Sequence, residues 1–495
     1  MVEIICNDEK YTYNAYHIIK AFYPAQDVVS CVDEKASNYV MATLPDGGKI
    51  TVLKEVAVDN EGNRLPEETA EEKKIVKHKI DMDLYKKLEE ATGQSLAWGI
   101  LTGVRPTKIA MKQLEEGMTK EEFVPWFMED VLASEEKAAL SWEIAEREKA
   151  LLDQLDYENG YSLYVGIPFC PTVCTYCSFS SGSLAAWKNH VDAYLEALCK
   201  ELTFIGKVSR EKKLNTIYIG GGTPTTLSAE QLDKLLTCID ENFSREHLLE
   251  FTVEAGRPDS ITKEKLQVLR NHDISRISIN PQSMQQKTLD VIGRKHTVQD
   301  ICDAYHMARE LGFDNINMDI IAGLPGENAE DMKDTLAQIE ALAPDSLTVH
   351  SLAIKRAAKM GQDRKAGQDQ TDLDEMNANM SIMIHDAAMS AAKQNLFPYY
   401  LYRQKNIAGN FENVGYAKVD KAGIYNILIM EEKQSIIAAG AGASTKIVLK
   451  EPVEIPGNTK KKTTTLMRLE NVKAIDAYIS RIDEMIERKG EWLWR

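Results

Sequence analysis

Three closely spaced cysteines are the residues of this chain best suited to metal or redox chemistry. Cys170, Cys174 and Cys177 follow the spacing C-x3-C-x2-C. Thiolates hold iron–sulfur clusters, and a [4Fe–4S] cluster has four irons to ligate. Three ligands from one loop leave the fourth iron open, and an open iron can chelate the amino and carboxylate groups of S-adenosylmethionine. We therefore predict a [4Fe–4S] cluster here that cleaves the S–C5′ bond and generates a 5′-deoxyadenosyl radical.

Two other uses of these cysteines stay open on spacing alone. A structural zinc site takes four ligands, usually as two separated pairs, and no second Cys/His pair follows at a usual spacing. Cys174 and Cys177 have the C-x-x-C spacing of a thiol redox pair, although thioredoxin-like pairs belong to a different topology. The spacing and its place after a strand favour the cluster over both.

The other five of the eight cysteines are isolated in the sequence. Eight cysteines in 495 residues do not make a disulfide framework. Cys199, Cys238 and Cys302 lie in helical patterns, and we expect them to be buried as small hydrophobic residues.

The elements that must position the cysteine loop are short apolar runs alternating with amphipathic helices. This alternation predicts a parallel sheet with crossover helices, here a partial (β/α)6 barrel. In such barrels the chemistry lies on loops after the carboxyl ends of the strands. The predicted strands are 162–167, 216–219, 249–253, 274–279, 315–320 and 346–349.

The segments on either side of this barrel have different patterns. Residues 1–66 predict a small α+β module and residues 67–157 a helical segment, with one continuous helical pattern over 120–155. The barrel is assigned to residues 158–353 and a C-terminal α+β extension to residues 354–495. In that extension we expect strands at 397–403, 423–430 and 435–439, and a last helix at 472–488.

Polar residues at the ends of the predicted strands form a candidate ligand site. The glycines in Gly220–Thr225 let the backbone approach a ligand, and free amides there would hold a carboxylate. Glu254 offers a carboxylate to ribose hydroxyls, and the guanidinium of Arg294 suits a carboxylate. Gln282 follows the fourth predicted strand, and Asp319 lies at the end of the fifth. Tyr164 points into the barrel mouth if its strand alternates.

The sequence resembles the radical SAM superfamily, and more closely its oxygen-independent coproporphyrinogen III dehydrogenase family. The stretch that carries the resemblance is Tyr164-x-x-Ile167-Pro168-Phe169-Cys170 followed by Cys174-x-Tyr176-Cys177-x-Phe179. A histidine commonly precedes Ile-Pro-Phe-Cys in that family, and this chain has Gly166 there. The chain as a whole resembles the HemZ-type branch, including residues 101–106.

The resemblance implies roles for individual residues. It implies that the backbone of Gly221, Gly222 and Thr223 holds the methionine amino group. It places Tyr164 near the sulfonium, and it places Tyr176 and Phe179 at the cofactor. It also assigns cofactor contacts to Glu254, Gln282, Arg294 and Asp319.

The resemblance also implies a substrate and partners. The substrate would be coproporphyrinogen III, two of whose propionates lose CO₂ and hydrogen to give the vinyl groups of protoporphyrinogen IX. The electron donor would be a protein such as flavodoxin or ferredoxin. Five cations lie in or near candidate loops, and we expect each to be a solvated surface charge: Arg105, Lys108, Arg257, Arg356 and Arg403.

Two alternative functions remain on sequence grounds. One is a radical SAM enzyme with another substrate, and the other is a haem-binding chaperone of the same family. The chaperone branch typically carries a His-Asn-x-x-Tyr-Trp motif, whereas the comparable stretch 405–410 lacks the histidine and both aromatic residues.

Composition bounds the remaining possibilities. The chain has 59 Lys and Arg against 76 Asp and Glu, a net charge of −17, which disfavours a general nucleic-acid binder. Its 44% hydrophobic and 27% charged residues are typical of a globular protein. No apolar run approaches the about 20 residues of a membrane span, and the first residues lack the pattern of a secretory signal. We expect a cytoplasmic protein.

Overall fold

The computed structural model describes residues 1–53, 69–103, 105–178, 181–354, 358–365, 373–404, 411–455 and 463–494. The chain forms two compact units. Unit 1 contains residues 1–146, 371–381 and 401–412, and unit 2 contains residues 147–370, 382–400 and 413–495.

Unit 1 begins with a small sheet and continues as helices. Its strands β1 (Val2–Cys6), β2 (Val28–Val32), β3 (Asn38–Thr43) and β4 (Lys49–Leu53) lie in the order β2-β1-β3-β4. The helices are α1 (Glu9–Phe22), α2 (Ala70–Thr92), α3 (Thr107–Glu115), α4 (Lys120–Val131) and α5 (Glu135–Leu152), whose last turns belong to unit 2.

The continuous helix that we predicted over 120–155 is wrong. Leu132 has φ 58°, in the left-handed region, and ends α4. A new helix then starts, with Ser134 Oγ accepting a hydrogen bond from the Lys137 amide at 3.3 Å. A side-chain acceptor at a helix N-terminus satisfies an amide that has no partner within the helix.

Unit 2 is built on a parallel sheet of the six predicted strands. They are β5 (Gly160–Ile167), β8 (Lys213–Gly221), β9 (Glu250–Glu254), β10 (Arg276–Ser278), β11 (Ile316–Ala322) and β12 (Ser346–Ser351). Each strand pairs in parallel with the next one along the chain, which confirms the α/β class and the partial barrel.

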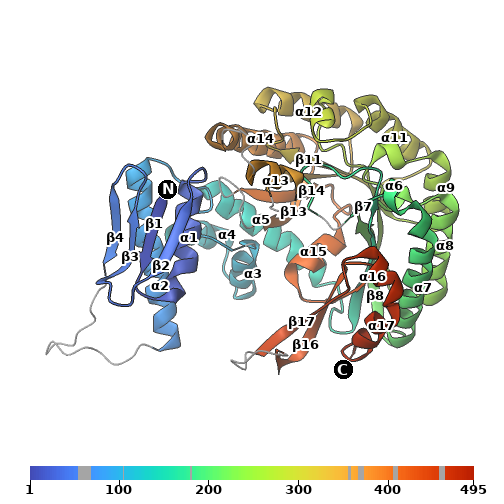
Figure 1. The fold of residues 1–495 in the computed structure, drawn as a ribbon, viewed down its shortest axis with the longest axis horizontal. Helices are drawn as coiled ribbons and strands as arrows, with labels where there is room; N and C mark the ends of the chain where they lie inside the picture. The colour runs from blue at the N-terminus through green and yellow to red at the C-terminus, as the bar shows by residue number, and fades with distance from the viewer. Residues whose placement is uncertain are drawn as a thin grey trace. The chain divides into compact units, whose positions relative to one another are not determined.

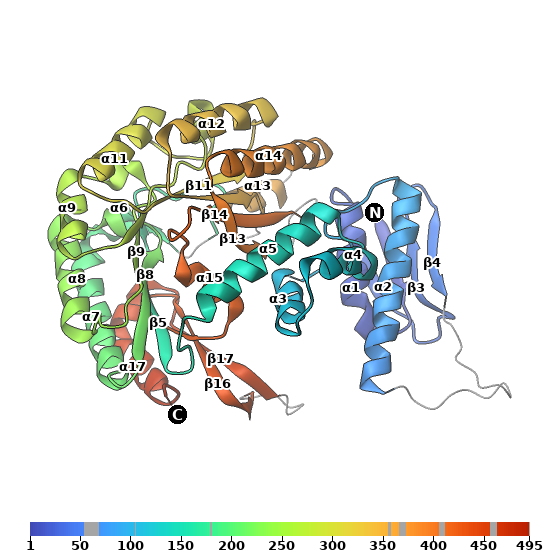
Figure 2. The ribbon, with the colours of Figure 1, turned by 180° about the vertical axis from the view of Figure 1, so that it is seen from behind.

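Helices cover the outer face of this sheet. Figures 1 and 2 show α7 (Val191–Val208), α8 (Ala229–Asn242), α9 (Lys263–Asn271), α11 (Val298–Glu310) and α12 (Ala329–Leu342) following one another along it. The sheet is open, and it is extended by β14 (Glu412–Ala417), antiparallel to β12, and by β15 (Ser435–Ala439), parallel to β5.

The two faces of the sheet differ in chemistry. Apolar residues such as Val165, Ile219 and Val253 are fully buried on the helix-covered face. The alternate residues are polar or aromatic, and register pairs Tyr164 with Tyr218. Because side chains alternate along a strand, every second residue of the apolar runs faces inward. The inner face is therefore a polar surface that leads to the strand ends.

The C-terminal part contains the largest error of the sequence prediction. Residues 423–430 were predicted as a strand, but they form helix α15 (Ile424–Glu431). A short apolar run does not distinguish a strand from a buried helix. Here the Glu250 carboxylate accepts hydrogen bonds from the amides of Ile424 and Tyr425, which caps the helix N-terminus.

Further strands follow that the sequence did not reveal. β16 (Ser444–Glu454) and β17 (Thr463–Glu470) pair as antiparallel strands beyond β15. β13 (Phe397–Arg403) begins the extension, as predicted, and α14 (Leu373–Lys393) precedes it. The predicted last helix is divided into α16 (Ile475–Ser480) and α17 (Ile482–Gly490).

Two further expectations can be compared with the structure. Cys199, Cys238 and Cys302 are partly exposed rather than buried, and Cys238 Sγ donates to the carbonyl oxygen of Cys199 at 3.8 Å. In the described ranges, no helix combines the length and the apolar character that crossing a membrane requires.

Candidate active site

The cysteine loop leaves the end of β5 and is fixed to the turn at residues 292–294. Cys170 ends the short strand β6 (Phe169–Cys170), which pairs with β7 (Gly182–Ser183). The amide of Thr175 donates to the Ile292 carbonyl at 3.1 Å. The Thr172 hydroxyl donates to the Gly293 carbonyl, also at 3.1 Å. These bonds hold the three cysteines, none of which is in a disulfide, beside that turn.

The glycine-rich turn after β8 packs against the cysteine loop. A Cβ at Gly222 would lie 2.6 Å from the Phe169 carbonyl oxygen and 3.0 Å from Cys170 Sγ, so only glycine fits there. The amides of Gly222 and Thr223 donate to the Ile167 and Phe169 carbonyls, both at 2.7 Å. The expectation that these amides are free for a ligand is therefore wrong.

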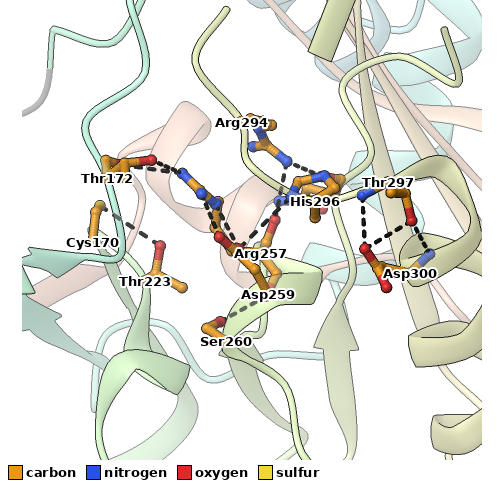
Figure 3. A network of polar contacts seen from close by, with 12 residues as sticks. Cys170, Thr172, Thr223, Arg257, Asp259, Ser260, Arg294, His296, Thr297 and Asp300 are labelled. Atoms are coloured by element: carbon orange, nitrogen blue, oxygen red, sulfur yellow. Dashed lines mark hydrogen bonds and ion pairs between the residues drawn. The ribbon is translucent and has the colours of Figure 1, made fainter. Parts of the chain in front are cut away.

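The sulfurs of Cys170 and Cys174 accept hydrogen bonds from neighbouring loops. Thr223 Oγ1 donates to Cys170 Sγ at 3.6 Å, and Arg257 Nη1 donates to Cys174 Sγ at 3.7 Å. Figure 3 shows Thr223 beside Cys170 and Arg257 beside Thr172 of the same loop. Burial raises the pKa of the Cys170 thiol, and hydrogen bonds with Ser181 and Thr223 and the charge of Arg257 only partly oppose it.

Glu254, at the end of β9, has an unusual environment. Tyr218 Oη donates to Glu254 Oε1 at 2.5 Å. Burial raises the pKa of Glu254 to about 7, and the nearby negative charge of Asp319 adds to this, against the opposing effects of Tyr218 and Arg276. The carboxyl group therefore titrates near neutral pH.

Three tyrosines stack beside this carboxyl group on the inner face. The rings of Tyr218 and Tyr425 lie 4.5 Å apart, centroid to centroid, with an interplanar angle of 22°. Tyr164 stacks at 6.3 Å from both. Tyr425 comes from α15, so this misassigned helix supplies part of the inner surface. Tyr164 points inward, as the alternation predicted.

Gln282 lies beside Asp319, which sits within β11 rather than at its end as predicted. The Gln282 amide donates to the Asp319 carbonyl at 2.9 Å, and Gln282 has φ 65°, which is rare for a residue with a side chain. Burial acts to raise the pKa of Asp319, but hydrogen bonding and charge from His350 outweigh it and the pKa is lowered. His350 Nε2 lies 3.7 Å from Asp319 Oδ2.

Arg294 contacts the cysteine loop through Tyr176, and its residue surface is 5% exposed. Its Nη1 donates to the Asn280 carbonyl at 2.5 Å, and its Nη2 to Tyr176 Oη at 3.5 Å. Arg294 Nε and Asn280 Oδ1 are buried and have no hydrogen-bond partner among the residues described. Unpaired buried polar atoms are costly, so they indicate a ligand that supplies the missing partners.

These residues fit an iron–sulfur cluster with S-adenosylmethionine. The donor set is three thiols on one loop, with N–H and O–H donors at two of the sulfurs, as clusters require. Unpaired atoms of Arg294 and Asn280 adjoin that loop. Within the described ranges, no three His, Cys, Asp or Glu side chains already form a metal-binding group.

Most of the predicted site residues lie near the cysteine loop or the strand ends beside it. Three buried arginines were not recognised as such from the sequence. Phe179 lies outside the described residues, as does Arg356. Arg257 and Arg403 are 3% and 4% exposed, so the expectation of solvated charges is wrong for both. Arg276, 2% exposed on β10, was also missed. An arginine inside an otherwise buried strand pattern is a sequence signal that would have marked it.

Comparisons with known proteins identify the family of this chain. The family model of the Radical SAM superfamily matches residues 164–339. The chain is 41% identical over 428 residues to the oxygen-independent coproporphyrinogen-III oxidase-like protein HemZ of Bacillus subtilis, covering 85% of this chain and 81% of that protein. It is 37% identical over 195 residues to the heme chaperone HemW of B. subtilis, covering 39% and 51%.

A solved structure shows the same fold. It is coproporphyrinogen III oxidase (HemN) from Escherichia coli, described as a radical SAM enzyme. The TM-score is 0.52 at 20% identity, over 68% of this chain and 73% of that one.

Proposed function

Because this chain belongs to the radical SAM superfamily and, within it, to the family of oxygen-independent coproporphyrinogen-III oxidase-like proteins, we propose that it is an oxygen-independent coproporphyrinogen III dehydrogenase. The superfamily uses a [4Fe–4S] cluster and S-adenosylmethionine. The reaction would convert two propionates of coproporphyrinogen III to vinyl groups. A reducing protein such as flavodoxin or ferredoxin would supply the electron.

Cys170, Cys174 and Cys177 would hold the cluster. When bound, the cluster and S-adenosylmethionine supply a radical that removes a hydrogen atom from an unreactive carbon. The packed turn against the loop, with no space for a side chain at Gly222, excludes water from one side of Cys170. Arg257 and Thr223 orient two of the thiols by hydrogen bonds.

The other predicted residues would bind S-adenosylmethionine. Arg294 offers its unpaired Nε to the carboxylate. Glu254 would accept hydrogen bonds from the ribose hydroxyls, and Tyr218 fixes its orientation. Gln282 and Asp319, adjacent to each other, would contact the cofactor beside it.

The contacts of the glycine turn refine the role of that turn. The amides of Gly222 and Thr223 are already engaged, so the turn would offer carbonyl oxygens, which suit the methionine amino group. Tyr164, on the inner face, would lie near the sulfonium, and Tyr176 and Phe179 would line the cofactor.

The observation that carries the proposed substrate is the extent of one match. Similarity to the coproporphyrinogen-III oxidase-like protein extends over 85% of this chain, well beyond the superfamily match at 164–339. Similarity that includes both flanking parts supports a common substrate better than similarity of the cofactor domain alone. The propionates would need cationic partners. Arg257 and Arg403 do not fit that role, because both are buried and already donate to other groups.

Label transfer tests this proposal directly. Reconstituted protein is incubated without oxygen with S-adenosylmethionine, a reductant and coproporphyrinogen III deuterated at the propionate β-carbon. We expect protoporphyrinogen IX and deuterated 5′-deoxyadenosine to form together, and neither to form with Cys170→Ala. Cofactor cleavage that is slow and unchanged by the porphyrinogen would instead indicate another substrate.

A second candidate is the haem chaperone, favoured by the match to HemW. That match spans only about half of the chaperone's length. The residues 405–410 lack the expected histidine and aromatics, and they lie outside the described residues. Stoichiometric haem binding without decarboxylation under reducing conditions would favour the chaperone over the dehydrogenase.

A further inference from the structure

Arg257 has a position that cofactor binding by the predicted residues does not explain. It follows β9, and its side chain is 4% exposed. Its Nη1 faces three acceptors of the cysteine loop: the carbonyl and hydroxyl oxygens of Thr172, both at 3.1 Å, and Cys174 Sγ at 3.7 Å. One guanidinium corner therefore contacts both the backbone of the loop and the sulfur of an expected cluster ligand.

The opposite edge of the same guanidinium is clamped by Asp259. Arg257 Nε donates to Asp259 Oδ1 at 2.9 Å, and Nη2 donates to Oδ2 at 2.6 Å, which is a bidentate pair. His296 Nδ1, on a fully buried side chain, lies 3.7 Å from Asp259 Oδ1. A fork held at two points has little freedom to rotate, so the direction of Nη1 toward the loop is fixed.

The loop that carries Arg257 is itself anchored. Ser260 Oγ donates to the Arg257 carbonyl at 2.7 Å and lies 2.6 Å from Thr225 Oγ1. Lys265 Nζ donates to the carbonyls of Thr225 and Ser260. Figure 3 shows Arg257 between Thr172 on one side and Asp259 on the other, with Arg294 and His296 nearby.

The ion pair with Asp259 offsets much of the positive charge of Arg257. The guanidinium still directs one N–H group at Cys174 Sγ. Hydrogen bonds to cluster sulfurs help to set the reduction potential. They do so because a donor stabilises the negative charge that the ligands gain when one electron enters the cluster.

We propose that Arg257 is a positioning residue that holds the cysteine loop through Thr172 and, through its N–H donor at Cys174, raises the reduction potential of the [4Fe–4S] cluster. The bidentate pair with Asp259 fixes the direction of the guanidinium. This inference rests on the proposed function only in requiring that the cysteines hold a cluster. It does not depend on the substrate.

The test measures cluster content and potential in matched variants. Arg257→Gln keeps a polar side chain without the fork, and Arg257→Lys keeps the charge as a single point. Arg309→Gln is the control, because Arg309 also pairs with a buried aspartate, Asp345, at 2.6 Å but lies beside the start of β12, away from the strand ends that carry the cysteines. Iron and sulfide are quantified, and the midpoint potential is determined by EPR-monitored titration.

We expect Arg257→Gln to retain the cluster with a more negative midpoint potential. A ratio of reduced to oxidised cluster about tenfold lower at the same solution potential corresponds to a shift of about 59 mV for a one-electron couple. Arg257→Lys should fall between this variant and the wild type, and Arg309→Gln should match the wild type.

Three results would overturn the inference. One is Arg257→Gln with full iron content and the wild-type potential. A second is Arg257→Lys with full iron and the wild-type potential, which decides the case if the glutamine variant loses its cluster. Loss of the cluster in both variants would leave Arg257 as a structural clamp without a tuning role. A wild-type protein that binds no cluster would instead refute the proposed function.

Discussion

Two buried networks in unit 2 both contain charged residues, but they differ in whether all of their polar atoms have hydrogen-bond partners. The cysteine-side network consists of Arg257, Asp259, Arg294 and His296. The helix-side network joins α7 to the C-terminal helices and consists of Glu201, Asn471, Tyr478 and Lys489. Glu201 and Lys489 have side chains that are 0% and 2% exposed.

The helix-side network satisfies its own hydrogen bonds. Glu201 accepts from Lys489 Nζ at 2.6 Å, from Asn471 Nδ2 at 2.9 Å, from the Gly440 amide at 2.9 Å and from Tyr478 Oη. Lys489 Nζ also donates to Asn471 Oδ1 at 2.6 Å. A buried polar network with every member paired stabilises one packing arrangement.

The cysteine-side network is open by comparison. Arg294 Nε and Asn280 Oδ1 are unpaired in the part of the chain that the structure describes. One of its donors, Arg257 Nη1, points at the Cys174 thiol. The difference teaches that burial of charge does not by itself mark a functional site. Unused hydrogen-bonding capacity beside reactive side chains does, because only a ligand can satisfy it.

The largest effect is expected from removing a cluster ligand. Cys170→Ala, Cys174→Ala and Cys177→Ala should each abolish the iron–sulfur absorbance and the cleavage of S-adenosylmethionine, because a three-thiolate site has no spare ligand. The helix-side network should be unaffected, so the apo protein should keep its free energy of unfolding. A variant that retains four irons and full cleavage would contradict the assignment.

Breaking the closed network should reduce stability instead of cofactor binding. Lys489→Met leaves the Glu201 charge buried without its cation, which costs about 3–5 kcal/mol of unfolding free energy. Chemical denaturation of the apo protein measures this.

Lys200→Met is the matched control for that variant. Lys200 pairs with Asp483 across the same two helices, α7 and α17, but both side chains are exposed, so little change is expected. Equal effects of the two substitutions would show that the buried pair has no special importance.

Arg294 tests the open network through affinity. A hydrogen bond to a charged group contributes about 1.5–3 kcal/mol, so Arg294→Ala should weaken S-adenosylmethionine binding roughly 10- to 150-fold. Arg294→Lys should also weaken it, by less, because lysine lacks the fork geometry. Isothermal titration of the cluster-loaded protein provides the dissociation constants. Unchanged affinity in Arg294→Ala would remove this residue from the site.

The smallest effect concerns pH and Glu254. Its pKa in the folded protein is about 7, above the ordinary 4.5, so the folded state binds more protons than the unfolded state between these values. Stability from this group therefore falls as pH rises from about 4.5 to 7. Glu254→Gln should flatten that slope in denaturation experiments at a series of pH values.

Glu340→Gln is the control, because hydrogen bonding and charge from Lys393 lower the pKa of Glu340. It should keep the slope that Glu254 produces. If Glu254→Gln also keeps it, the carboxyl group does not titrate near neutral pH.

The sequence determined the elements with strong local signals. The six strands and their crossover helices repeat an alternation that only a parallel sheet accommodates. The carboxyl ends of parallel strands meet at one edge, so the alternation also indicated where polar residues would gather. The cofactor contacts of Glu254, Gln282, Arg294 and Asp319 came from this pattern together with the family resemblance, and they remain predictions.

Tertiary structure decided what depends on contacts between distant residues. The run 424–431 is a helix because Glu250, far away in sequence, caps it. Arg257 is buried because Asp259 and Thr172 satisfy its guanidinium, which no local pattern records. The sequence by itself determined which residues reach the strand ends. Only the packing of loop against loop decided which of their polar atoms are already paired, and that difference separates the ligand site from the scaffold.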